Sequence, residues 1–212
     1  MSAVMSPSEQ RVVLHDISWE TYERLLKDLE DCSAPRLTFD QGVLEIMSPL
    51  SDHEEDNRNL SLLVDIFAEE FEIEIRNLGS TTFRREEFQR GFEPDSCFYI
   101  QNAFRIRGKR RIDLEVDPPP DLVIEIDLTN DSIDKFPLFA KLRVPEVWRV
   151  SGGNVEIFTR DGDRYQRRES SSVLPPLSAQ DLTELLEASI SMKRPAWLRL
   201  MRARFRNLKP SS

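Results

Sequence analysis

The hydrophobic pattern in the first third of the chain predicts two helices and a hairpin between them. Apolar residues recur at helical spacing over 19–29, directly after Ser18, a residue type that often caps helix N-termini. Apolar stretches at 36–39 and 43–47 flank a turn-forming Asp-Gln-Gly, which indicates a hairpin. Helical spacing returns from residue 51 or 52 and continues to about residue 71, so the second helix is long.

Extended patterns dominate the middle of the chain. Polar and apolar residues alternate over 72–77, and short extended stretches are predicted at 81–84 and 93–100. Residues 103–106 and 111–114 flank a glycine and are predicted to form a further hairpin.

The second half combines strands with helices. Residues 122–128 begin with a continuous apolar run, which is typical of a strand buried on both faces. The remaining predicted elements are a short helix ending at Leu142, strands at 146–150, 155–159 and around 164–168, and a helix at 179–188. This order predicts an α/β sandwich with a mixed central β-sheet flanked by helices.

The length of 212 residues favours one main domain. We expect an N-terminal leader at 1–17, in which His15 has no role, a domain at 18–190, and a basic tail at 191–212. Apolar residues alternate with arginines in that tail, which therefore resembles an amphipathic helix. It is expected either to pack on the domain or a second subunit, or to lie along DNA.

Composition narrows the class of protein. No apolar run approaches the roughly 18 residues that a membrane span requires, so no membrane partner is expected. Residues 1–10 lack the basic start and apolar centre of a secretion signal, and two cysteines do not form a disulfide framework. A cytoplasmic location is therefore expected.

The charge distribution bears on nucleic-acid binding. The net charge of −9 argues against broad affinity for phosphate. Basic residues nevertheless cluster in two places: residues 188–212 contain seven and no acidic residue, and a second cluster surrounds Gly108. The second cluster comprises Arg105, Arg107, Lys109, Arg110 and Arg111. Either cluster is a candidate phosphate contact or an ordinary solvated surface.

Three carboxylates occupy strand ends and indicate the chemistry. Asp95 follows Pro94 at the start of an apolar run, and Glu125 and Asp127 end the run at 122–124. Side chains two residues apart on a strand share a face, so Glu125 and Asp127 point the same way. Such carboxylates repel one another unless a cation neutralises them, and hard oxygen ligands favour Mg²⁺ or Mn²⁺. The pattern predicts a metal-dependent hydrolytic site.

With these motifs, the sequence resembles the Uma-two family of restriction-endonuclease-like proteins, within the PD-(D/E)XK nuclease superfamily. The resemblance spans about Ile17 to Phe158 and rests on Pro94-Asp95 and on residues 47–53, 120–127 and 134–148. Arg143 departs from it, because glycine is common there in the family. The resemblance implies a restriction-endonuclease-like sandwich and Mg²⁺- or Mn²⁺-dependent cleavage of phosphodiester bonds. It also implies DNA as the substrate and a homodimer.

The resemblance also assigns roles to residues. Asp95 and Glu125 would bind the metal, with the Ile126 carbonyl as a third ligand. The superfamily's lysine normally stands two residues after the second acid, where this chain has Asp127. Lys135 is the expected substitute, because a lysine near a helix N-terminus usually needs an anion nearby.

Several alternatives remain open for the other residues. Lys141 is the second choice for the lysine. Asp127 is either a further metal ligand or an ordinary strand-end residue. His53, at the start of the long helix, either supports the site or is a cap or surface residue.

Two other functions compete with the nuclease. One is a catalytically inactive module that binds nucleic acid or protein, which the displaced lysine and the acidic net charge favour. The other is a metal-dependent hydrolase of a smaller phosphoester. A basic rim around the acids would favour the nuclease over the small-molecule hydrolase, and metal binding would separate both enzymes from the module. The chain has neither a glycine-rich phosphate loop nor a Gly-x-Ser-x-Gly motif.

Overall fold

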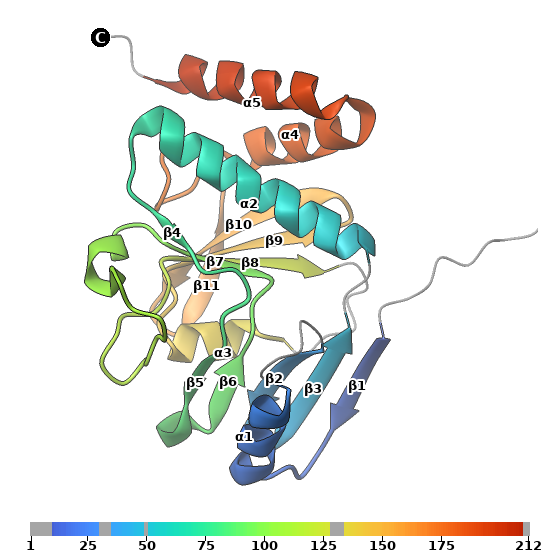
Figure 1. Ribbon diagram of the computed structural model, residues 1–212, viewed down its shortest axis with the longest axis vertical. Coiled ribbons are helices and arrows are strands. Elements are labelled where there is room, and N and C mark those ends of the chain that lie inside the picture. Colours follow the sequence, from blue (N-terminus) through green and yellow to red (C-terminus); the bar gives the residue numbers. More distant parts are fainter. Residues whose placement is uncertain (1–9, 30–34, 49–50, 128–133, 210–212) are drawn as a thin grey trace, which may run out of the picture.

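A six-stranded mixed sheet forms the centre of the protein, with a five-stranded antiparallel sheet beside it (Figure 1). The computed structural model describes residues 10–29, 35–48, 51–127 and 134–209. The six-stranded sheet has the order β11-β10-β9-β8-β7-β4, and its β8 and β9 are parallel. The five-stranded sheet has the order β1-β3-β2-β6-β5.

The elements have the following bounds. The six-stranded sheet contains β4 (Arg76–Asn77), β7 (Ser96–Tyr99), β8 (Leu122–Asp127), β9 (Glu146–Ser151), β10 (Asn154–Asp161) and β11 (Arg164–Arg168). The five-stranded sheet contains β1 (Gln10–Leu14), β2 (Arg36–Asp40), β3 (Val43–Ser48), β5 (Phe83–Arg85) and β6 (Arg90–Phe92). The helices are α1 (Trp19–Asp28), α2 (Ser51–Phe71), α3 (Phe136–Lys141), α4 (Ala179–Ser191), α5 (Arg194–Leu208) and the 3₁₀ helices η1 (Glu86–Phe88) and η2 (Ala103–Ile106).

Helices cover both faces of the six-stranded sheet, as the apolar run in β8 predicts. Leu122, Ile124 and Ile126 pack into a core shared with α2, α4 and α5. Val123 points the other way, into a second core that contains residues of α3. The predicted α/β sandwich with a mixed central sheet is confirmed.

The second core also joins the two sheets. Phe83 of β5 and Phe92 of β6 pack into it, and the ring of Phe92 contacts that of Phe139 edge-on at a centroid distance of 4.9 Å. Helix α1 covers the five-stranded sheet through a smaller apolar cluster that includes Trp19 and Tyr22. The five-stranded sheet therefore lies on the α3 side of the central sheet (Figure 1).

The C-terminal tail packs on the domain. Trp197, Met201 and Phe205 recur every four residues along α5 and are buried against α2 and α4. Several tail arginines pair with carboxylates of those helices: Arg202 with Glu69 and Glu70, Arg204 with Asp181 and Glu184, and Arg206 with Glu70. These arginines are therefore paired with carboxylates within the protein.

Three local expectations are wrong. Residues 10–14 of the expected leader form β1, which pairs with β3. Only Arg76 and Asn77 of the predicted strand at 72–77 are extended in the sheet. The predicted hairpin at 103–114 is absent from the described chain, and residues 103–106 form η2 instead. Asp121 explains this turn, because its carboxylate accepts the backbone N–H groups of Ile100 and Asn102 and so ends the strand.

Candidate active site

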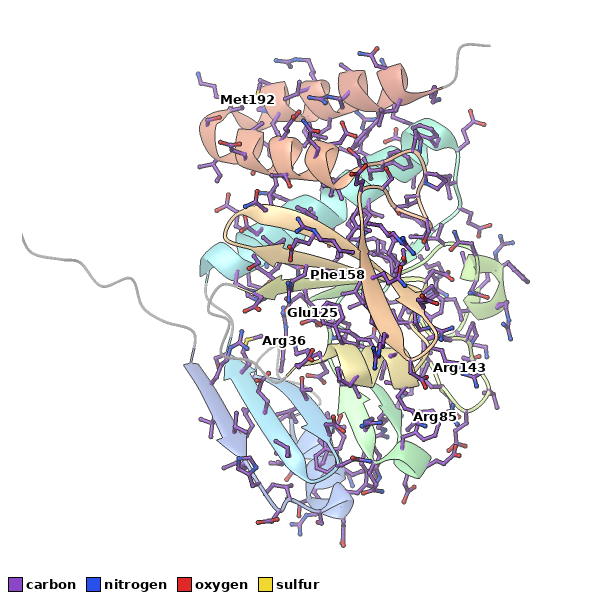
Figure 2. All side chains as sticks on the ribbon, turned by 180° about the vertical axis from the view of Figure 1, so that it is seen from behind. Arg36, Arg85, Glu125, Arg143, Phe158 and Met192 are labelled. Carbon is purple, nitrogen blue, oxygen red and sulfur yellow. The ribbon has the colours of Figure 1, made fainter. Side chains whose placement is uncertain are left out.

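The register of two central strands brings Asp95 and Glu125 together. Antiparallel β7 and β8 pair Ser96 with Ile124, so the next residues along, Asp95 and Glu125, lie opposite each other. Asp95 is 2% exposed and Glu125 is 9% exposed. Both lie at the end of the central sheet that faces the five-stranded sheet, where Figure 2 shows Glu125 close to Arg36 in projection.

Protein groups surround the Asp95 carboxylate. Its Oδ2 accepts the backbone N–H of Ile126 at 2.6 Å and lies 3.2 Å from Nε2 of His53. Its Oδ1 forms an ion pair with Nη1 of Arg36. In addition, the side-chain amide of Asn57 donates to the Asp95 backbone carbonyl at 2.9 Å. The position and charge of Asp95 are therefore fixed by several elements at once.

Arg36 is the site residue that sequence reasoning missed. Arg36 is the first residue of β2 in the five-stranded sheet and is 8% exposed. Its guanidinium contacts two carboxylates: Nη1 pairs with Asp95, and Nη2 donates to Oε1 of Glu54 at 2.5 Å. Buried arginines are rare without carboxylate partners. An arginine at the start of an apolar strand was the available signal, but its partner could not be identified from the sequence.

Helix α2 presents a polar stripe to the end of β7. His53, Asn57 and Ser61 recur every four residues, and Ser61 Oγ lies 2.9 Å from Ser96 Oγ. This spacing places them on one face of the helix. The same spacing can be seen in the sequence, from which only His53 was predicted as a site residue. His53 is fully buried beside Asp95, so it is neither a surface residue nor a cap.

His53 is neutral near pH 7. Burial lowers its pKa to about 4, and the positive charges of Arg36 and Lys135 act in the same direction. A hydrogen bond with the Ile126 backbone opposes them.

Lys135 binds Glu125. Its Nζ donates to Glu125 Oε2 at 2.7 Å, and each side chain is 12% exposed. Lys135 directly precedes α3, and Asp134 Oδ1 accepts the Phe136 N–H at 3.0 Å, which fixes the turn into that helix. The expectation that Lys135 has an anion nearby is therefore met by Glu125.

The second oxygen of the Glu125 carboxylate, Oε1, is available to bind a ligand. This oxygen is buried and has no hydrogen-bond partner among the described residues. Glu125 and Lys135 line a cavity of about 230 Å³, together with Asp127, whose side chain shares their side of β8. Lys141, the second choice for the catalytic lysine, instead lies over the ring of Phe88.

Two other buried carboxylates are structural. Asp121 accepts three hydrogen bonds from Ile100 and Asn102. Glu146 accepts from Trp148 Nε1 and from Ser171 and Ser172. Their hydrogen-bonding capacity is used within the fold, which distinguishes them from Glu125.

The basic cluster around Gly108 does not border Glu125. Arg107 pairs with Glu74 at 2.5 Å, and Lys109 pairs with Asp117. Arg105 is exposed, whereas Arg110 and Arg111 line a separate cavity next to Arg36.

The donor groups fit a hard divalent cation. No group of three His, Cys, Asp or Glu side chains in the described ranges converges as a metal cluster. The ligand set expected from the sequence is not such a group of three side chains, because it combines two carboxylates with a backbone carbonyl. Asp95, Glu125 and Ile126 supply only oxygens, and Glu125 Oε1 is available for a ligand. The Ile126 carbonyl points to the same side of β8 as the N–H that Asp95 accepts.

A mixed central sheet with facing carboxylates at the ends of adjacent strands defines a restriction-endonuclease-like α/β protein. The chain belongs to the Uma2 family, whose description is "Putative restriction endonuclease" and whose model matches residues 19–193. Its structure resembles the crystal structure of a putative nuclease belonging to DUF820 from Anabaena variabilis ATCC 29413. That similarity has a TM-score of 0.50 and 14% sequence identity, and covers 80% of this chain and 99% of the other. No curated protein matches the chain.

The family description supports a nuclease function in general terms. None of the helices within the described parts of the chain is long and apolar enough to cross a membrane.

Proposed function

We propose that this protein is a metal-dependent nuclease that hydrolyses phosphodiester bonds of DNA. The observation that carries the proposal is the 2.7 Å contact between Lys135 and Glu125, with Asp95 directly opposite on the adjacent strand. A buried acid pair with a lysine beside it can hold a divalent cation and stabilise the charge that develops during phosphodiester hydrolysis.

Asp95, Glu125 and the Ile126 carbonyl would hold Mg²⁺ or Mn²⁺. When bound, such an ion lowers the pKa of water and stabilises charge on the phosphoryl oxygens. The backbone N–H of Ile126 and the guanidinium of Arg36 orient Asp95 for this role.

Lys135 contributes a fixed positive charge at the same place. Glu125 Oε2 holds the ammonium group, so Lys135 can orient the attacking water or stabilise the negative charge that develops on the phosphate. Asp127 lines the same cavity and would help to hold water or the ion there. His53 is a positioning residue, because it contacts Asp95 as a neutral imidazole.

A second candidate function is a module that retains the nuclease fold without catalysis. The observation in its favour is that both carboxylate oxygens of Asp95 already have protein partners, namely Arg36, His53 and the N–H of Ile126. In such a module, the guanidinium of Arg36 permanently supplies the positive charge that a metal would supply in an enzyme.

The test measures cleavage of supercoiled, linear and single-stranded DNA with Mg²⁺, Mn²⁺ or EDTA. Glu125→Gln and Lys135→Met are compared with the wild type, and calorimetry measures metal binding. The control pair is Glu184→Gln and Arg204→Met, which removes an ion pair of the same 2.7 Å length between α4 and α5.

We expect both site variants to fold and to lose cleavage at least 100-fold, while the control variants keep it. A wild type that neither cleaves DNA nor binds either ion would contradict the nuclease and support the module. Cleavage of small phosphodiesters without cleavage of DNA would instead indicate the small-molecule hydrolase.

We further propose that the nuclease acts as a homodimer, since two copies of one site reach both strands of a duplex. Analytical ultracentrifugation with and without DNA tests this assembly. A monomer under both conditions would contradict it.

A further inference from the structure

A cavity of about 660 Å³ lies next to the site, and most of the charged residues that line it are cations. Its walls come from α1, β2, the segment 80–84 and the segment 110–112. The basic residues that line it are Lys27, Arg36, Arg84, Arg110 and Arg111, and the acidic ones are Glu23 and Glu93. This excess of positive charge stands out in a chain whose net charge is −9.

The two acidic residues are already engaged by protein groups. Glu93 accepts the backbone N–H of Leu37 at 3.0 Å and the hydroxyl of Thr82 at 2.5 Å. Glu23 lies 3.3 Å from Arg84. Arg36 is already balanced by Asp95 and Glu54, and Arg84 by Glu23, so the excess of positive charge in the cavity does not come from these two arginines. Lys27 and Arg110 contribute to that excess, and their field favours an anionic ligand.

The basic cavity leads to Asp95. Arg36 and Ser80 also line a second cavity of about 470 Å³. Its other charged lining residues are the cations Arg58 and Arg194 and the carboxylates Glu54, Asp65 and Asp95. The two cavities therefore meet at Arg36 and Ser80. Together they form a path whose excess of cations lies in the first cavity and which ends at Asp95, one of the two acidic residues of the candidate active site.

We propose that this path, the cation path, binds the phosphate backbone of the nucleic-acid strand that the site cleaves. Its cations come from separate elements, namely α1, β2, β5 and the segment before residue 112, so they line a wall rather than a single point. Repeated phosphates along a polymer match such an arrangement, and each phosphate contact adds a salt-dependent contribution to affinity. The inference rests on the proposed nuclease function and adds the route by which the substrate reaches Asp95.

The test separates binding from cleavage. In a Glu125→Gln background with EDTA, fluorescence anisotropy measures binding of labelled single-stranded and duplex DNA at several salt concentrations. The path variant carries Lys27→Ala, Arg84→Ala and Arg110→Ala, all exposed side chains. The control variant removes the same charges elsewhere, by Lys193→Ala, Arg164→Ala and Arg199→Ala, which are also exposed and line neither cavity.

We expect the path variant to bind DNA at least 10-fold more weakly near 0.1 M salt, with a salt slope smaller by about 2–3, whereas the control changes affinity less than threefold. Equal losses in both variants, or no loss in the path variant, would overturn the inference. So would tight binding of inorganic polyphosphate by a protein that does not bind DNA.

The outcomes also separate this inference from the proposed catalysis. If DNA binds through the cation path but the otherwise unaltered protein does not cleave it with metal present, the inference stands and the nuclease proposal is contradicted. If the otherwise unaltered protein cleaves DNA and the path variant binds DNA normally, the nuclease proposal stands and the inference about the cation path is contradicted.

Discussion

Replacing Arg36 with methionine should lower the free energy of unfolding by about 3–5 kcal/mol, because it leaves a buried carboxylate without its cation. The size follows from burial. The side chains of Arg36 and Asp95 are 9% and 1% exposed, so solvent screens their interaction little. Exposed ion pairs contribute only about 0–1 kcal/mol. Arg206, which is 64% exposed where it pairs with Glu70, provides that comparison.

Urea denaturation at pH 7.5 measures the effect in Arg36→Met, Asp95→Asn and the double variant, with Arg206→Met as the control. An asparagine at 95 can still accept the Ile126 N–H, so we expect the double variant to regain about 2–3 kcal/mol relative to the sum of the single effects. The control should lose less than about 1 kcal/mol.

The same variants report on the metal. A divalent cation that binds Asp95 replaces the missing charge, so Mg²⁺ should raise the midpoint of Arg36→Met more than that of the wild type. The reasoning is refuted if Arg36→Met costs no more than Arg206→Met, or if the effects of Arg36→Met and Asp95→Asn simply add.

Four further outcomes are expected, each measured by urea denaturation. Folding lowers the pKa of His53 to about 4, so the folded state favours the neutral imidazole. The free energy of unfolding should therefore be highest above pH 6.5 and decrease as the pH falls towards 4. In His53→Gln this decrease should be smaller by up to about 3 kcal/mol. A methyl group at Gly91 would clash first with the hydroxyl oxygen of Tyr22 and would also lie 2.8 Å from its Cζ, so Gly91→Ala should cost about 1–3 kcal/mol. The cost should be smaller in a Tyr22→Phe background, which removes the hydroxyl, and an equal cost there would contradict the clash with that oxygen. Arg143 has a φ of 63° at the end of α3, so Arg143→Gly should stabilise the protein by about 1 kcal/mol, and a loss would show that its side chain contributes more than its backbone costs. Trp197→Ala should cost about 3–5 kcal/mol, whereas a cost below about 1 kcal/mol would contradict the packing of α5 on the domain.

Local pattern predicted much of the central sheet. A continuous apolar run identifies β8, and a period of two places Glu125 and Asp127 on one side of it. The left-handed backbone of Arg143 is a conformation that favours glycine at this position. The roles of Asp95, Glu125 and Lys135 in catalysis remain predictions.

What the sequence could not supply is long-range pairing. Arg36 reaches Asp95 only because the two sheets pack together, and no local period encodes that contact. Edge strand β1 was missed for a similar reason, since it pairs with β3, and α1 and β2 lie between the two strands in the sequence. The predicted hairpin at 103–114 failed because Asp121, well beyond it in the chain, binds the backbone at residues 100 and 102.

The chain passes from one sheet to the other immediately before Asp95. Strand β6 of the five-stranded sheet ends at Phe92, and β7 of the central sheet begins at Ser96. Asp95 therefore stands at the joint, and the cation that balances it arrives only when the five-stranded sheet docks. Contacts between segments distant in sequence form slowly during folding. The ion pair between Arg36 and Asp95 should thus form among the last steps of folding, and a chain whose central sheet alone has formed would keep Asp95 solvated and without Arg36.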